Sequence, residues 1–91
     1  MFAIVKVVEI RPLGANRLRI AFSDGSFGEH DFSDLIDETG SMVEPLRDPN
    51  LFGQVFVEMG VPTWPNGFAI DAIKLHMDMA AAGELSRDAA E

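Results

Sequence analysis

The residues of this sequence that could do chemistry are its two histidines and its 15 carboxylates. His30 and His76 are far apart in the chain and share no spacing typical of a zinc site, so we interpret both as structural. A carboxylate pair could catalyse hydrolysis, but no pattern brings two of them together in an apolar cleft. The sequence also lacks a nucleophile elbow, a phosphate-binding loop and a dinucleotide fingerprint. We therefore predict a protein that is not an enzyme and uses neither a metal nor another cofactor.

The overall charge indicates which partners fit. The chain of 91 residues has 15 acidic and 7 basic residues, which give a formal net charge of −8. Such a field repels phosphate backbones and anionic lipids, so we expect neither direct nucleic-acid binding nor membrane binding. A basic protein is the natural electrostatic partner, although the charge could also serve solubility alone.

Cysteine is absent from the sequence, which excludes disulfides, thiolate metal sites and cysteine nucleophiles. This composition fits a reducing cytoplasm, which is the location that we expect for the protein. No apolar run approaches the ~20 residues needed to cross a bilayer.

Acidic residues are frequent between Asp31 and Asp48, where Arg47 is the one base. The stretch lacks the alternating oxygen ligands of a calcium-binding loop. Two interpretations stay open for it: a solvated surface with carboxylates at helix starts, or a docking surface for a basic partner. Its internal carboxylates are Asp34, Asp37, Glu38 and Glu44.

The segment from Thr63 to Asp71 contains the one tryptophan of the chain and a Pro-Asn-Gly turn. Trp64 could anchor the core or form a platform for a ligand, because it has a large apolar body and one hydrogen-bond donor. Pro65, Asn66 and Gly67 are typical of a sharp chain reversal. If the domain has a ligand pocket, we expect it beside this turn.

Strands must form the first half of the domain. β-Branched residues predict a strand over Phe2–Ile10 that is largely covered on both faces, and residues 11–16 predict a turn. Arg17–Phe22 alternates strictly, which indicates a half-buried strand. A loop of Ser23, Asp24 and Gly25 would lead into residues 27–32. It would pair the two arginines of the second strand with Glu29 and Asp31 and place Gly25 in a left-handed conformation.

Short helices and a second hairpin follow. Ser33 can cap a helix over residues 34–36, and Asp48 followed by proline predicts a second helix start. Residues 54–59 and 61–64 predict two strands around Met59-Gly60, and Ile70–Ala82 has helical period with Gly83 as its cap. We expect the core face of this last helix to consist of Ile70, Ile73, Met77 and Ala80.

These elements predict one small α+β domain over residues 1–83, followed by a flexible C-terminal tail over residues 84–91. The domain should have an antiparallel sheet of about four to five strands, two short helical segments and a C-terminal helix.

Three segments of the chain stand out together: Phe22–Ser26 with Asp31 and Phe32, Pro45–Val55, and Thr63–Asp71 with its Trp-Pro-Asn-Gly motif. In order and spacing they resemble the bacterial domain of unknown function 2442 family. The resemblance implies a small α+β domain with an antiparallel sheet and no established activity. Some relatives are encoded beside a small partner protein in toxin–antitoxin-like pairs. This chain has Ala69 where family members often have an acidic residue.

Our leading functional prediction is a non-catalytic interaction module, such as a regulatory or antitoxin-like subunit that binds a basic protein. The alternative is a small-ligand binding domain with a pocket near Trp64. Homo-oligomerisation through an unpaired sheet edge also stays open. The candidate binding or fold-signature residues are Asp24, Gly25, Arg47, Asp48, Trp64, Pro65, Asn66 and Gly67.

Overall fold

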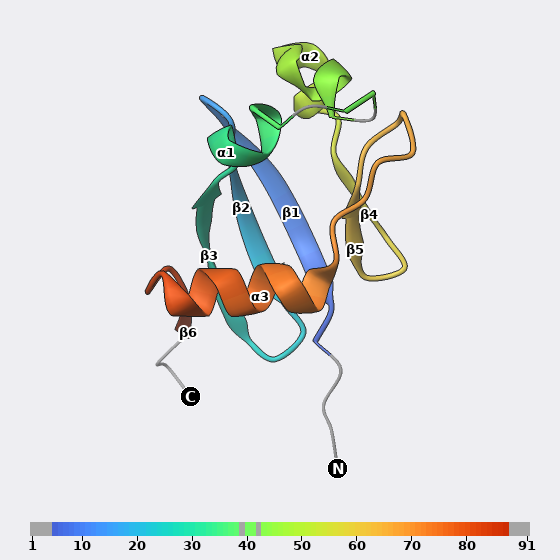
Figure 1. Ribbon diagram of the computed structural model, residues 1–91. Coiled ribbons are helices and arrows are strands. Elements are labelled where there is room, and N and C mark those ends of the chain that lie inside the picture. Colours follow the sequence, from blue (N-terminus) through green and yellow to red (C-terminus); the bar gives the residue numbers. More distant parts are fainter. Residues whose placement is uncertain (1–4, 39, 42, 88–91) are drawn as a thin grey trace.

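The computed structural model describes residues 5–38, 40–41 and 43–87 of the chain. It contains an antiparallel sheet with the strand order β1-β2-β3-β6 and a separate β4–β5 hairpin. Helix α3 crosses one face of the larger sheet (Figure 1). The predicted α+β class is confirmed, with the strands divided between two sheets. The elements are β1 (Val7–Gly14), β2 (Arg17–Phe22), β3 (Ser26–Asp31), α1 (Ser33–Ile36), the 3-10 helix η1 (Glu44–Arg47), α2 (Pro49–Phe52), β4 (Phe56–Glu58), β5 (Val61–Thr63), α3 (Ala72–Ala81) and β6 (Ser86–Arg87).

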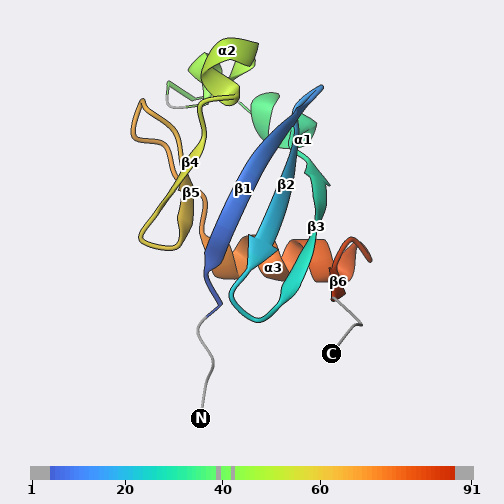
Figure 2. The same cartoon turned by 180° about the vertical axis from the view of Figure 1, so that it is seen from behind.

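The core fills the space between the larger sheet and the elements that cover it. From behind, β1, β2 and β3 lie side by side, and the β4–β5 hairpin lies beside β1 (Figure 2). The amide of Val7 donates to the carbonyl of Gly60 at 2.8 Å and so ties the hairpin to β1. Large side chains that are fully buried include Leu18, Ile20, Leu46, Trp64 and Met79.

The register predicted for the β2–β3 hairpin is confirmed. Arg19 pairs with Glu29 and Arg17 with Asp31 across a three-residue loop. The charged contacts do not follow these strand pairs, however. The guanidinium of Arg17 bonds the carboxylate of Glu29 diagonally at 2.8 Å. Arg19 instead lies 5.0 Å from the ring centre of Phe27, a cation–π contact. Burial of one face therefore sets the register, and the charges adapt to it.

Strand β1 begins later and extends further than the predicted strand over Phe2–Ile10. It reaches Gly14, so residues 11–14 pair with β2 instead of turning. The turn consists of Ala15 and Asn16, with φ of 52° and 64°. A two-residue loop of this kind matches the twist of the flanking strands. Val8 is 59% exposed, so the expectation that both strand faces are covered is wrong. Residues 2–4 of the predicted strand lie outside the described residues.

Helix α3 forms where the apolar period predicted a helix, but it buries a different face. Ile73 is 48% exposed, Met77 is 64% exposed and Ala80 is also exposed, so the predicted core face is wrong at these three residues. The helix carries two apolar stripes, and the period alone does not rank them. The stripe that packs on the sheet consists of Ala72, Leu75 and Met79.

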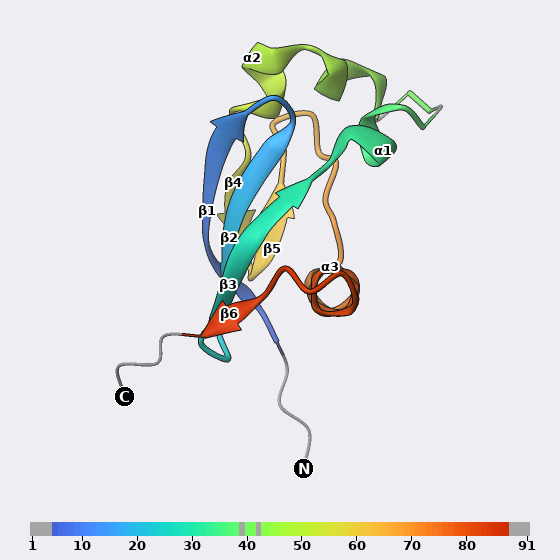
Figure 3. The same ribbon diagram turned by 90° about the vertical axis from the view of Figure 1, so that its left-hand side faces the viewer.

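Residues 84–87, which we call the C-terminal strap, are folded onto the sheet, and this corrects the predicted flexible tail. Gly83 has a φ of +73° and ends α3 as predicted. Strand β6 then pairs with Ser26 and Phe27 of β3 (Figure 3). The strap passes so close to Gly28 that an added Cβ would lie 2.1 Å from the carbonyl oxygen of Glu84. The absence of a side chain at this position therefore makes room for the strap. Residues 88–91 lie outside the described part.

Candidate functional site

Trp64 is a core residue, as the first of its two interpretations predicted. Its side chain is 0% exposed, and its Nε1 donates to the carbonyl of Phe52 at 2.9 Å. Its ring packs against those of Phe52 and Phe68, with centroid distances of 5.7 and 5.8 Å. This burial leaves no face of the indole for a ligand.

Pro65, Asn66 and Gly67 form the predicted turn. The amide of Gly67, which has a φ of +93°, donates to the carbonyl of Trp64 at 2.9 Å. The side-chain oxygen of Asn66 accepts from the amide of Phe68 at 3.2 Å. These contacts reverse the chain and place Trp64 under the turn, so the motif positions the core.

Arg47 and Asp48 hold neighbouring elements together. Arg47 donates to the carbonyls of Ile36 and Glu38 at 3.0 and 3.2 Å, at the end of α1. The carboxylate of Asp48 accepts from the amide of Asn50 at 2.9 Å and caps α2, as predicted. Arg47 thus joins η1 to the end of α1, and Asp48 fixes the start of α2 directly after η1, so both residues are used within the fold.

Gly25 confirms the predicted loop geometry between β2 and β3. It has a φ of +91°, and its amide donates to the carbonyl of Phe22 at 3.1 Å. The turn after Trp64 has the same pattern: a glycine with positive φ, Gly67, donates its amide to the carbonyl three residues before it. The structure therefore uses one loop design twice.

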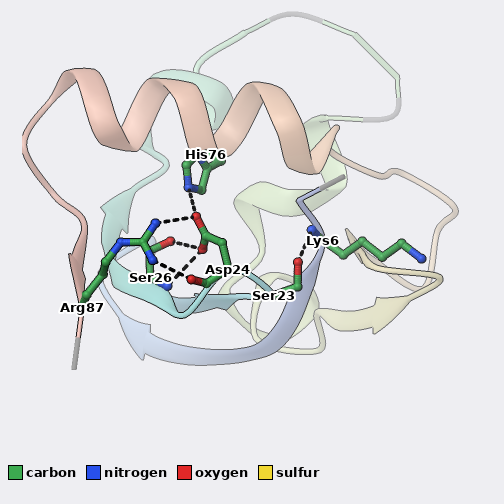
Figure 4. Close-up of polar contacts among 6 residues, drawn as sticks. All are labelled: Lys6, Ser23, Asp24, Ser26, His76 and Arg87. Carbon is green, nitrogen blue, oxygen red and sulfur yellow. Dashed lines mark hydrogen bonds and ion pairs between the residues drawn. The ribbon is translucent and has the colours of Figure 1, made fainter. Parts of the chain in front are cut away.

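Asp24 is the centre of a polar cluster with Ser26, His76 and Arg87, which we call the Asp24 cluster (Figure 4). One carboxylate oxygen accepts from the amide and the hydroxyl of Ser26 at 3.0 and 2.6 Å. The other lies 3.0 Å from Nε2 of His76 and accepts from Arg87 at 3.1 Å. The cluster thus joins the β2–β3 loop, α3 and the C-terminal strap.

The electrostatics of the Asp24 cluster favour a structural role. Burial raises the pKa of Asp24, but hydrogen bonds from Ser26 and the contact with His76 outweigh it and lower the pKa to about 2. A carboxylate with so low a pKa is a weak base at neutral pH. Ser26 is buried, and its hydroxyl donates to Asp24 instead of His76. The three residues therefore lack the order of a serine-hydrolase triad.

One cavity of about 410 Å³ adjoins the Asp24 cluster. The donors His76 and Arg87 in its wall are bonded to Asp24, so a ligand there would compete with that carboxylate for them. The lining consists of Ser26, His76, Ala80, Leu85, Ser86 and Arg87.

A second cavity of about 370 Å³ lies between α1, α3 and the end of β3; we call it the α1–α3 groove. Its floor is apolar, with Phe32 and Leu75 buried and with Leu35 and Ile70 packed against the core. Carboxylates stand along its rim, where the exposed Lys74 bonds Asp78 at 3.1 Å. The lining consists of His30, Phe32, Asp34, Leu35, Glu38, Ile70, Lys74, Leu75 and Asp78.

His30 forms one wall of this groove and is held by the strap. Its Nδ1 lies 2.7 Å from a carboxylate oxygen of Glu84, and its ring meets Phe32 edge-on at 4.7 Å. Among the described residues, no group of three or more histidines, aspartates or glutamates could hold a metal ion. The groove thus presents an apolar floor and charged rim groups, which can contact the side chains of a partner.

No family model, curated protein or solved structure matches this chain.

The site residues predicted from the sequence thus serve the fold, and the groove is formed by other residues. Neither described cavity has Trp64 in its lining, so a ligand pocket beside it stays a prediction without support. Asp34 and Glu38 do come from the acidic stretch that we interpreted as a candidate docking surface. The contacts of His30 with Glu84 and of His76 with Asp24 had no signal in the sequence, because they join residues distant in the chain. No helix in the described part is long and apolar enough to cross a bilayer.

Proposed function

We propose that this protein is a non-catalytic interaction module whose α1–α3 groove binds a basic segment of another protein. One observation carries the proposal: an apolar floor lies beneath three rim carboxylates, and a single lysine is their counter-charge. Such a site fits a side chain that combines an apolar stem with a cationic head, such as arginine or lysine. The rim carboxylates are Asp34, Glu38 and Asp78.

The charge of the whole molecule supports the same partner. A net charge of −8 attracts a basic segment over long range and disfavours nucleic acid as an occupant. Exposed apolar side chains next to the groove add contact area. Ile73 and Met77 lie on the outer side of α3, whose residues Lys74 and Asp78 line the groove.

The biological role and the cellular location are further parts of the proposal. The three segments that resemble the domain of unknown function 2442 family support a regulatory or antitoxin-like role. The absence of cysteine from the sequence supports a cytoplasmic location.

A peptide-binding measurement tests the proposal. The probe is the labelled peptide Lys-Val-Arg-Val-Lys-Val, with Glu-Val-Glu-Val-Glu-Val as its acidic counterpart, measured by fluorescence anisotropy at low salt. We expect the basic peptide to bind and the acidic one not to bind. The double variant Asp34→Asn/Glu38→Gln should weaken binding by about fivefold, because two exposed charges that face the peptide are lost.

A charge-matched variant serves as the control. Glu9→Gln/Glu58→Gln removes two exposed carboxylates from β1 and β4 and should change the affinity by less than about twofold. Equal losses in both double variants would mean that only net charge attracts the peptide. That result, or no binding of the basic peptide, would overturn the groove as its site.

A further inference from the structure

The outer edge of β3 is mostly unpaired. β6 is two residues long and pairs with Ser26 and Phe27 alone, although β3 extends to Asp31. Among the described residues, no strand pairs with the outer edge of β3 beyond Phe27. Figure 3 shows β6 meeting one end of β3, while α1 follows the other end. An unpaired edge offers backbone donors and acceptors to an incoming strand.

The direction of the backbone groups follows from the ladder with β2. The amide of Phe32 donates to the carbonyl of Asn16, on the β2 side, at 2.8 Å. Alternate residues of an antiparallel strand direct their backbone groups to the same neighbour. The backbone N–H and C=O groups of Gly28 and His30 therefore point toward β2, as the amide of Phe32 does. Those of Glu29 and Asp31 point away from β2, toward the unpaired edge. Phe27 lies two residues before Glu29, so its backbone groups point to the same edge, and there it pairs with Ser86 of β6.

The side chains along this edge separate the two faces of the sheet. Glu29 and Asp31 place carboxylates on the outer face, and both are exposed. Hydrogen bonds from the hydroxyl and amide of Ser33 hold the pKa of Asp31 below its ordinary value, which keeps it charged. His30, between them, points to the other face and lines the α1–α3 groove. A strand laid along this edge would therefore direct alternate side chains to the outer face and to the groove with its rim of carboxylates.

We propose that the partner segment binds as an added β-strand along Glu29–Asp31, with basic and apolar residues in alternation. Its basic side chains would enter the groove beside His30, where their stems would cover the apolar floor and their charged ends would meet Asp34, Glu38 and Asp78. Its apolar side chains would lie on the outer face, where Arg17 already neutralises Glu29. This inference rests on the proposed function and names the conformation of the bound segment. A second copy of this chain is disfavoured as the occupant, because its own acidic edge would place like charges opposite each other.

N-methylation of the peptide backbone tests this geometry. Two versions of Lys-Val-Arg-Val-Lys-Val are compared with the unmodified probe: one N-methylated at its lysines and arginine, the other at its valines. A paired strand uses the amide groups of one parity only. We expect one version to bind more than about tenfold weaker and the other to bind within about twofold of the unmodified peptide.

Amide hydrogen exchange gives an independent readout on the protein. The amides of Glu29 and Asp31 should exchange fast in the free protein and at least about tenfold slower with the unmodified peptide bound. The amide of Met59, in the exposed turn of the β4–β5 hairpin beside β1, serves as the reference and should not change. Protection of Glu29 and Asp31 without peptide, together with a dimer in light scattering, would identify a second copy and overturn the proposal.

The possible failures can be told apart. If the unmodified peptide binds and the groove variant weakens it, but both methylated versions bind equally well, strand addition is wrong and the proposed function stands. If both methylated versions lose binding equally, the bound segment is not a strand paired along one edge, and the inference is again overturned. If the unmodified peptide does not bind, the proposed function fails together with the inference.

Discussion

Asp24 shows how one carboxylate can join three distant parts of a chain. Its two carboxylate oxygens contact Ser26 on β3 and His76 on α3, and its backbone carbonyl accepts from Arg87 on β6. The loop that carries Asp24 could be predicted, because Asp-Gly between two alternating strands is a local signal. Its partners on α3 and β6 could not be predicted, because His76 and Arg87 lie 52 and 63 residues further along the chain. The same holds for His30 and Glu84.

We predict that Asp24 contributes stability that depends on pH. Because its folded pKa of about 2 lies below the ordinary value of 3.8, its contribution is complete above about pH 4 and is lost as the pH falls toward 2. The stability difference between wild type and Asp24→Asn should therefore shrink by about 1 kcal/mol between pH 5 and pH 2, with part of the full effect screened by water.

Urea denaturation at each pH measures this difference. A constant difference for Asp24→Asn would mean that its carboxylate is equally charged in the folded and unfolded chains at each pH.

At the scale of elements, prediction from the sequence worked where one local rule dominated. The β2–β3 register, the cap at Asp48 and the glycine end of α3 each follow from a few adjacent residues. Prediction from the sequence failed where one helix has two apolar faces and either could be buried. α3 has two apolar stripes, and only the position of the sheet decides that Leu75 and Met79 are buried while Met77 is exposed. The groove depends on that rotation, so the sequence alone does not reveal it.

We predict that Gly28 is required for the strap to pack on β3. A Cβ in Gly28→Ala would lie 2.1 Å from the carbonyl oxygen of Glu84, so the strap must move away. Overpacking of this kind costs about 1–3 kcal/mol, which urea denaturation measures. In a Ser86→Pro background, where the β6 pairing is already disrupted, the cost should fall below about 1 kcal/mol. Strictly additive losses would show that Gly28 acts independently of the strap.

At the scale of the whole molecule, the charge balance acts on folding and binding in opposite directions. A net charge of −8 repels itself within a small domain and attracts a basic partner. The composition makes this conflict evident without a structure. The structure adds its location: Asp34 and Glu38 lie on one groove, so part of the repulsion is concentrated where a partner would relieve it.

We predict that salt stabilises the fold while it weakens peptide binding. Raising NaCl from about 0.01 M to about 0.5 M shortens the screening distance from roughly 30 Å to a few Å. The free energy of unfolding should rise by about 1 kcal/mol, because net repulsion is screened. The affinity for Lys-Val-Arg-Val-Lys-Val should fall over the same range. Lower stability at high salt would show that ion pairs such as Arg17–Glu29 outweigh the net repulsion.

The turn after Trp64 also affects how the protein ages in storage. Asn66-Gly67 is a dipeptide prone to deamidation, which begins when the glycine nitrogen attacks the side-chain carbonyl carbon of asparagine. In this turn the amide of Gly67 donates to Trp64, and the side-chain oxygen of Asn66 is held by the amide of Phe68. Both reacting groups are thus restrained in the folded state, and the succinimide can form only when the turn opens. Chemical shelf life should therefore follow the opening equilibrium of the turn beside Trp64.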